Sequence, residues 1–373
     1  VAADSVTVSL DQTAGRDEYV QGLARLRLAQ GQEDRDAAIA LFERSIREDP
    51  GFAPAVAALA QAYARHFHST RDPVWAQRAE EEAHRASAMA PLYPEVRVAV
   101  AEVHLATGKA GRAVRVFGEI LEEDPGDYTT RVGLARALDA CGRGDAADQA
   151  FLEALQAQPD CWFAHNRIGE FYVRRGQCRE ALRSFLRVVE LAPGYAPGYS
   201  NVGAAYQYLG RNAEAIEAYR RSVGIRPNYP ALSNMATLLR SEGRLEEAAR
   251  SYEDSLGLND RDYRVWGNLG STYDLIPGRE KDAERCFRQA IALAERQREV
   301  DPSDPHLLAR LAQYLGERGQ KGAARQHSER ALELDGNRAD LRFLAASVYE
   351  DLGSAEDHER ACLELIRALE ELG

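Results

Sequence analysis

The sequence repeats itself at a nearly constant interval, and this periodicity restricts the fold more than any other feature. Prolines mark the interval, and all but the first step between them are equal in length: Pro50, Pro91, Pro125, Pro159, Pro193 and Pro227. A second series, of alanines, follows the same rhythm: Ala38, Ala79, Ala113, Ala147, Ala181, Ala215, Ala248, Ala283 and Ala324. Two series that share one interval predict an array of similar units, each packed on its neighbours.

Each unit is predicted to contain two helices. Most of the alanines are followed four residues later by an aromatic residue, on the same face of a helix: Phe42, Phe117, Phe151, Phe185, Tyr219, Tyr252 and Phe287. Glycines near the end of the preceding helix predict turns with positive φ: Gly108, Gly142, Gly176, Gly210, Gly243 and Gly319. A small residue in that first helix, such as Gly169 or Gly203, is expected to let the second helix approach closely.

This arrangement of small, aromatic and proline residues resembles the tetratricopeptide repeat, a helix-turn-helix unit whose length matches the interval found here. Two stretches carry the resemblance best: Asn201-Val-Gly-Ala-Ala-Tyr206 with Ala215, Tyr219 and Pro227, and the set Trp266, Leu269, Gly270, Tyr273, Ala283 and Phe287. The resemblance covers residues 17–373. It implies an all-α fold, a right-handed α-solenoid of about ten tetratricopeptide repeats.

Three places interrupt the interval. The segment His66–Pro73 adds seven residues and is interpreted as a polar loop between the two helices of the second repeat. One residue is missing near Pro230, and the second helix of the eighth repeat is predicted to run on from Ala290 through Glu299. Insertions in repeat arrays often carry binding specificity, but a tolerated insertion without a role explains them equally well.

Both ends of the chain depart from the pattern. Residues 1–16, with Val6, Val8 and Leu10 alternating with polar residues, are predicted to be a linker or the remnant of an upstream domain. Because the chain begins with Val1, we expect it to be part of a longer protein. In the last repeat His358 replaces the small residue and Cys362 the aromatic one, which predicts a degenerate terminal cap.

Composition argues against several classes of function. The net charge is −12 and no Lys/Arg stripe is present, which disfavours nucleic-acid binding. The sequence contains no run of about 18 apolar residues, so no membrane span is predicted. The sequence contains no phosphate-binding glycine loop, zinc-protease motif or nucleophile elbow, so we expect no enzyme activity and no cofactor. His66, His68 and Asp72 lack a further ligand, so no metal site is predicted.

Weaker signals suggest a source and a compartment. The basic residues are almost all arginine, with lysine only at Lys109, Lys281 and Lys321, as expected of a GC-rich bacterial genome. Five cysteines without a C-x-x-C pair are interpreted as reduced packing residues, which fits a cytoplasmic protein.

The resemblance also implies where a ligand binds, because the first helices of such repeats line a concave groove. The positive and negative residues predicted for this groove nearly balance in number, so we expect the groove to be close to neutral. Its charged residues include Arg136, Glu170, Arg174, Arg240 and Asp274. Phe163, Tyr208 and Leu275 are candidate anchors for apolar side chains. The clamp with which related repeats hold chaperone C-termini is predicted to be absent, since only Asn268 and Arg310 match its five positions.

Three successive repeats carry asparagine at the same position of the first helix. These are Asn201, Asn234 and Asn268, with Asn166 one place away in the repeat before. The series is similar to the asparagine ladder of the O-GlcNAc transferase superhelix, which implies that the amides grip the backbone of an extended peptide. The alternative is that each asparagine stabilises its helix against a neighbouring helix.

The sequence therefore predicts a protein-interaction scaffold or adaptor that binds a protein or peptide in its groove. Two other functions stay open. One is that the chain is the regulatory or substrate-recruiting tail of a larger bacterial enzyme, such as a kinase, cyclase or glycosyltransferase. The other is that it is an oligomerisation module that forms a homo-oligomer. The identity of the partner does not follow from the sequence.

Overall fold

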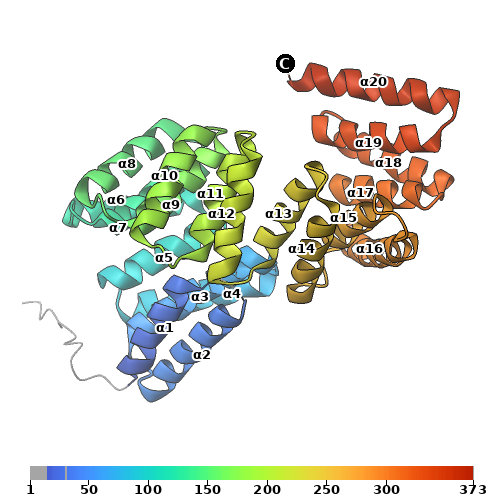
Figure 1. The fold of residues 1–373 in the computed structure, drawn as a ribbon. Coiled ribbons are helices and arrows are strands. Elements are labelled where there is room, and N and C mark those ends of the chain that lie inside the picture. Colours follow the sequence, from blue (N-terminus) through green and yellow to red (C-terminus); the bar gives the residue numbers. More distant parts are fainter. Residues whose placement is uncertain (1–14, 30–31, 373) are drawn as a thin grey trace, which may run out of the picture. The chain divides into compact units, whose positions relative to one another are not determined.

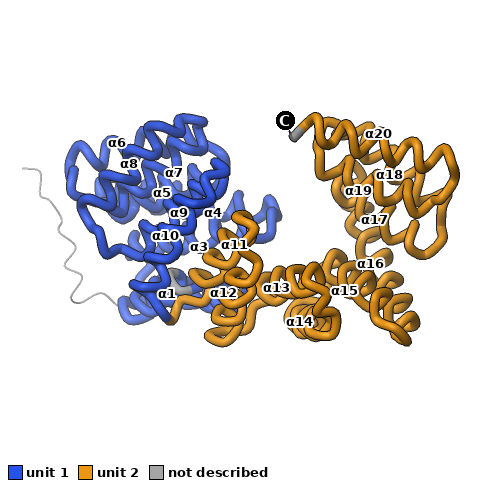
Figure 2. The backbone as a smooth tube through the Cα atoms, turned by 45° about the horizontal axis from the view of Figure 1, so that its top comes forward, with its two compact units in different colours: residues 1–193 blue, residues 194–373 orange. Residues whose placement is uncertain are grey.

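The computed structural model describes residues 15–29 and 32–372, which form helices and no strand (Figure 1). The chain divides into two compact units, Val1–Pro193 and Gly194–Gly373 (Figure 2). Val6, Val8 and Leu10, on which the linker prediction rests, lie outside the described residues. The first described helix begins at Arg16.

The helices of the first unit form five successive pairs. They are α1 (Arg16–Leu28), α2 (Gln32–Glu48), α3 (Ala53–Thr70), α4 (Pro73–Met89), α5 (Pro94–Ala106), α6 (Ala110–Glu123), α7 (Tyr128–Ala140), α8 (Gly144–Ala157), α9 (Trp162–Arg174) and α10 (Cys178–Leu191).

The second unit continues with five further pairs. They are α11 (Ala196–Tyr208), α12 (Asn212–Ile225), α13 (Tyr229–Ser241), α14 (Leu245–Leu258), α15 (Tyr263–Asp274), α16 (Glu280–Val300), α17 (Pro305–Glu317), α18 (Lys321–Asp335), α19 (Ala339–Leu352) and α20 (Ala355–Leu372). Odd-numbered helices are called A helices below, and even-numbered ones B helices. The predicted all-α array of about ten helix pairs is confirmed.

The predicted turns also occur where the sequence marks them. All six predicted turn glycines have φ between 70° and 80°, a region that only glycine enters without strain. Each of the six prolines stands two residues beyond the end of a B helix; α6, for example, ends at Glu123 before Pro125. Where these residues occur, glycine closes the A helix and proline follows the B helix, which sets the length of the repeat.

The core of each unit is built from the predicted small and aromatic residues. All nine alanines of the series are fully buried, and the seven aromatic residues that follow them are at most 2% exposed. The rings lie against small residues of the preceding A helix. A Cβ atom built on Gly203 would lie 2.8 Å from the ring of Tyr219, and one on Gly169 would overlap the ring of Phe185. Glycine is therefore required sterically at these positions.

We expect Gly169→Ala to lower the free energy of unfolding by about 1–3 kcal/mol, because the added methyl group overlaps the ring of Phe185. Gly118→Ala is the matched control, since Gly118 lies within α6 and a Cβ atom there would meet nothing within 4 Å. The control should gain about 0.5–1 kcal/mol from helix propensity. Urea denaturation followed by circular dichroism measures both, and equal effects of the two substitutions would refute the steric explanation.

The first insertion is not the predicted polar loop. Helix α3 continues through it to Thr70, and Arg71 takes the left-handed turn conformation with φ 58° that glycine adopts in other repeats. His66 is buried, with its ring 4.2 Å from that of Trp75 in α4. The interpretation as a loop was wrong because His66 and Phe67 were counted with their polar neighbours, although packing of His66 on Trp75 of α4 stabilises the five extra residues of α3.

The second insertion has the predicted form. Helix α16 has 21 residues, whereas the B helices α6, α8, α10, α12 and α14 have 14 each. Within the described parts of the chain, no helix is both long and apolar enough to cross a membrane.

The predicted register of the last helix is wrong. His358 and Cys362 are both exposed, and the buried residues of α20 are Asp357, Ala361, Glu364 and Ala368. Ion pairs hold this face inward: Arg325 Nη2 lies 2.6 Å from Asp357 Oδ1, and Arg342 pairs with Glu364. The sequence pattern failed here because acidic residues with arginine partners took the places of apolar ones.

Candidate peptide-binding site

In unit 1, predicted groove charges pair with charges on the neighbouring A helix. Arg136 of α7 donates to Glu102 of α5 over 2.8 Å, and Arg174 of α9 donates to Asp139 of α7 over 2.6 Å. Burial raises the pKa of Glu102, but Arg136 and further arginines outweigh it, so the net shift is downward. These side chains hold successive A helices together.

The other predicted residues of unit 1 are engaged on α9 itself. Asn166 is only 4% exposed and donates to Glu170 over 2.8 Å. Arg167 donates to the same carboxylate, and its guanidinium lies 5.0 Å from the ring centroid of Phe163. Phe163 is half-buried against the core. The candidates of this unit therefore offer few groups to a ligand.

In unit 2, two of the predicted asparagines bond to tyrosine hydroxyls of the preceding B helix. Tyr219 of α12 donates to Gln207 of α11 over 3.1 Å and also bonds with Asn234 of α13. Burial raises the pKa of Tyr219 to about 12, although the hydrogen bond from Asn234 opposes the shift. The hydroxyl thus joins two successive A helices.

The same arrangement recurs one repeat later. The hydroxyls of Tyr252 in α14 and Thr237 in α13 lie 2.8 Å apart, and Asn268 of α15 also bonds to Tyr252. Burial raises the pKa of Tyr252, whereas Thr237, Arg240, Arg310 and Asn268 lower it. Three predicted site residues, Arg240, Asn268 and Arg310, therefore all lower the pKa of this one hydroxyl. We call Tyr252 with these three residues the Tyr252 cluster.

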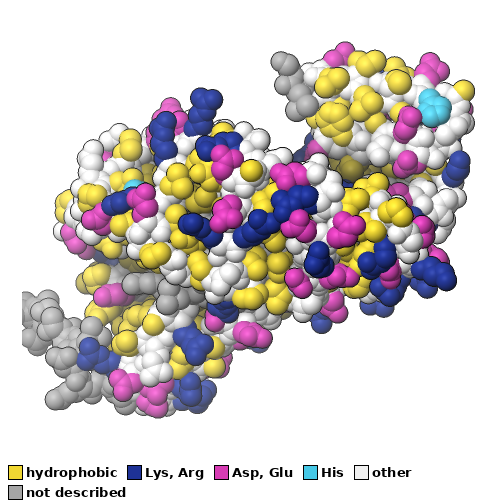
Figure 3. All heavy atoms as spheres, in the orientation of Figure 1, with side chains coloured by type: hydrophobic (Ala, Val, Ile, Leu, Met, Phe, Trp, Pro, Cys, Tyr) yellow, Lys and Arg dark blue, Asp and Glu magenta, His cyan; other side chains and the backbone are white. Residues whose placement is uncertain are grey.

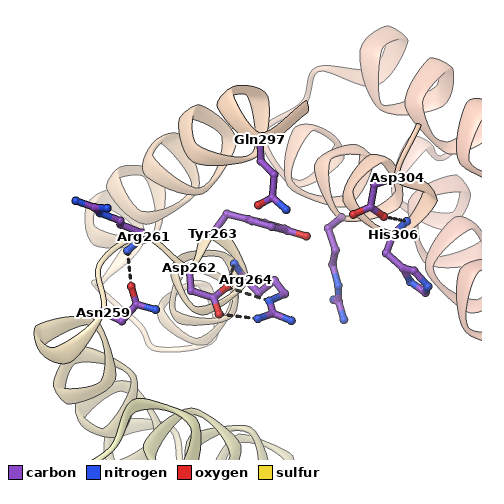
Figure 4. Close-up of a pocket in the computed structure, with 9 residues that line it drawn as sticks. Asn259, Arg261, Asp262, Tyr263, Arg264, Gln297, Asp304 and His306 are labelled. Carbon is purple, nitrogen blue, oxygen red and sulfur yellow. Dashed lines mark hydrogen bonds and ion pairs between the residues drawn. The ribbon is translucent and has the colours of Figure 1, made fainter. Parts of the chain in front are cut away.

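An open pocket of about 610 Å³ lies at the N-terminal ends of α15 and α17 (Figure 4). Its lining shares Arg310 with the Tyr252 cluster and otherwise consists of Asn259, Arg261, Asp262, Tyr263, Arg264, Gln297, Asp304 and His306. Gln297 belongs to the two extra turns of α16 and points toward the ring of Tyr263 in Figure 4. The predicted extension of α16 thus contributes directly to the wall of the pocket.

Hydrogen-bond donors that face this pocket outnumber its free acceptors. Asp262 accepts from the backbone N–H of Arg264 over 3.0 Å and from its guanidinium over 3.0 and 2.8 Å. Asp304 caps α17 by accepting from the backbone N–H groups of His306 and Leu307. Arg310 donates to Gln313 over 3.2 Å, and no carboxylate pairs with it among the described residues. The pocket therefore favours a carboxylate or carbonyl ligand.

The C-terminal ends of α15 and α17, the two helices whose N-terminal ends form the pocket, are acidic. Asp274 at the end of α15 pairs with Arg318, and Glu317 at the end of α17 accepts from Ser271 and Gln313 over 3.3 and 3.1 Å. Burial raises the pKa of Glu317, and Asp351 and Asp274 raise it further. The near-neutral total charge predicted for the groove thus conceals a separation along α15 and α17, with arginines at the pocket and acidic residues at the opposite helix ends.

Three predicted residues remain outside these clusters. Tyr208 and Leu275, at the C-terminal ends of α11 and α15, are 67% and 57% exposed. Asn201 of α11 is half-buried.

Sequence reasoning overlooked the tyrosine–asparagine pairs and the pocket. A signal for the pairs was present, because Tyr219 precedes Asn234 by almost the same separation as that between Tyr252 and Asn268. No comparable signal marked Tyr263 and Gln297, which come from helices whose relative packing the sequence does not specify.

We expect a double-mutant cycle of Asn268→Ala and Tyr252→Phe to give a coupling energy of about 0.5–1.5 kcal/mol, since each substitution removes the same hydrogen bond. Equilibrium unfolding in urea provides the four stabilities. Strictly additive losses would show that Asn268 does not stabilise α15 through Tyr252.

Glu317→Gln should stabilise the protein at neutral pH. The raised pKa means that the folded state binds a proton more readily than the unfolded state does, so ionised Glu317 destabilises the fold above that pKa. The stabilisation should shrink as the pH falls through the folded-state pKa toward about 4.3, the value in an unfolded chain. Urea midpoints of the variant and the wild type at several pH values test this; a difference that does not change with pH would contradict it.

Comparison with known proteins agrees with this repeat structure. Three family models described as tetratricopeptide repeat match residues 104–166, 196–229 and 231–262. The second match coincides with the α11–α12 pair and the third with the α13–α14 pair. The chain is a tetratricopeptide repeat protein. Such repeats form protein-interaction scaffolds, and the chain is a scaffold in this general sense.

Several solved structures are similar to this tetratricopeptide repeat protein. MamA matches 44% of this chain and 97% of its own at 22% identity, with a TM-score of 0.42. YrrB, described as a TPR protein with an unusual peptide-binding site, matches 48% of this chain and 91% of its own at 22% identity, with a TM-score of 0.42. The APC/C hetero-tetramer Cut9-Hcn1 matches 96% of this chain and 73% of its own at 16% identity, with a TM-score of 0.49. The search of curated proteins found no match.

Proposed function

We propose that unit 2 binds an extended segment of a partner protein across its A helices, with an acidic side chain or a terminal carboxylate in the α15–α17 pocket. The observation that carries the proposal is the convergence of Arg264, Arg310 and Tyr263 on a pocket whose own carboxylates already accept from backbone N–H groups. A carboxylate of the partner would supply the carboxylate acceptor that Arg310 lacks among the described residues.

The Tyr252 cluster suggests how the backbone of the segment is held. An asparagine that donates one N–H to a tyrosine hydroxyl keeps its carbonyl oxygen as an acceptor for a backbone N–H of the ligand. Asn234 and Asn268 are exposed or half-buried and stand at equivalent positions of successive A helices. The two roles weighed for these residues are therefore compatible, with one half of the amide serving the fold and the other the ligand.

A peptide series tests both parts of the proposal. A fluorescein-labelled, capped peptide with two glutamates should bind the full chain more tightly than the same peptide with two glutamines, as measured by fluorescence anisotropy. Arg310→Ala should weaken binding of the glutamate peptide by about tenfold or more, since it removes a charge-assisted contact. Asn268→Ala should weaken binding of both peptides equally, because the amide contacts backbone and not side chains.

Arg288→Ala is the matched control, because Arg288 is an exposed arginine of α16 that pairs with Glu284. Its affinity for both peptides should equal that of the wild type. Equal losses in Arg310→Ala and Arg288→Ala would show that the effect is a general one of net charge. The same variants, used in an affinity capture from lysate with mass spectrometry, then identify partners that depend on Arg310. The enzyme-tail and oligomerisation hypotheses stay predictions.

A further inference from the structure

The last helix presents a strip of large apolar side chains to solvent. Leu363, Leu365, Ile366 and Leu369 are between 41% and 62% exposed, and Cys362 beside them is exposed as well. Figure 3 shows hydrophobic side chains gathered over this helix. We call these five residues the α20 strip. In the rest of the described chain no helix carries more than two exposed large hydrophobic residues.

The spacing of the strip is that of a helix-packing face. Cys362, Leu365, Ile366 and Leu369 follow one another at i, i+3, i+4 and i+7, which places them along one side of α20. The opposite side is fixed to the preceding helices by the buried acids Asp357 and Glu364. This apolar face of α20 is suited to receive another helix.

The charges that accompany the strip are negative. Glu359 and Glu370 stand seven residues before and four residues after Ile366, so both lie along its flank, and Glu356 lies on the same side. All three are exposed, and within the described residues none has an ion-pair partner.

The basic residues of the helix are already paired. Arg360 donates to Glu329 over 2.8 Å and Arg367 to Glu364 over 3.0 Å, while His358 lies 3.1 Å from Glu350. The charge that α20 offers to a ligand is therefore acidic.

We propose that the α20 strip binds an amphipathic helix of a partner protein whose apolar face is flanked by lysine or arginine. Apolar side chains of that helix would cover Leu365, Ile366 and Leu369, and its cations would meet Glu359 and Glu370. A second copy of this chain is a poorer occupant, because its own α20 would bring further unpaired glutamates to the same flank, where like charges repel. The site is separate from the pocket on α15 and α17.

Designed peptides test the chemistry of this face. Two labelled helical peptides of about 18 residues share one leucine stripe, and one has lysines and the other glutamates beside it. Fluorescence anisotropy with the full chain should show binding of the lysine peptide and at least tenfold weaker binding of the glutamate peptide. Added salt should weaken only the former, since its advantage is electrostatic.

Variants locate the binding surface. Ile366→Ser with Leu369→Ser should weaken the lysine peptide at least tenfold, whereas Leu152→Ser with Ile225→Ser, which alters similarly exposed residues of α8 and α12, should leave it unchanged. Glu359→Lys with Glu370→Lys alters only exposed side chains and should reverse the preference between the peptides. This variant keeps the test valid should the serine variant lose its helical circular dichroism.

Three results would overturn the proposal. The first is no binding, or equal binding, of the two peptides by the wild type. The second is unchanged binding in both strip variants. The third is a dimer of the wild type in sedimentation that Ile366→Ser with Leu369→Ser dissociates, because the strip would then join two copies of this chain.

Discussion

The fold depends on one contact repeated along the chain: an aromatic ring of most B helices packed against a small residue of the A helix before it. Phe185 fits against Gly169, and Tyr219 against Gly203, at distances that leave no room for a side chain on the glycine. Ridges and grooves alone would allow several crossing geometries. Because the ring and the glycine fit in one way, the A helix is held at a fixed distance, and the polar groups it carries are held with it.

The candidate site follows from a variation of that contact. Where the ring is Tyr219 or Tyr252, the same buried aromatic residue also carries a hydroxyl to the edge of the core, and asparagines of the next A helix bond to it. A residue required for packing thus orients residues available for binding. Asn268 and Arg310 both lower the pKa of the Tyr252 hydroxyl, and Arg310 also lines a pocket that is rich in donors. Packing and recognition therefore share the same side chain in this part of the chain.

The departures from regularity are where the surface becomes distinctive. The two extra turns of α16 contribute Gln297 to the pocket, while the insertion in the second repeat is used for packing of His66 against Trp75. At α20 the apolar pattern faces solvent, because arginines draw Asp357 and Glu364 into the interior. One departure from the repeat, the insertion at His66, thus packs into the interior, whereas the other two, at α16 and α20, shape the exposed surface. The outcome depends on the residues of the neighbouring helices.

By itself the sequence determined the helices, their turns, the buried alanine and aromatic series and the long α16, because these depend on periodicity and on residues such as Gly142 whose conformation is local. It also predicted Asn268 and Arg310 as site residues, and this stays a prediction. Only the tertiary structure decided that the groove charges of unit 1 pair with each other, that a pocket opens beside Tyr263, and which face of α20 is buried. Those outcomes depend on distances between side chains of different helices, which spacing along the chain does not encode.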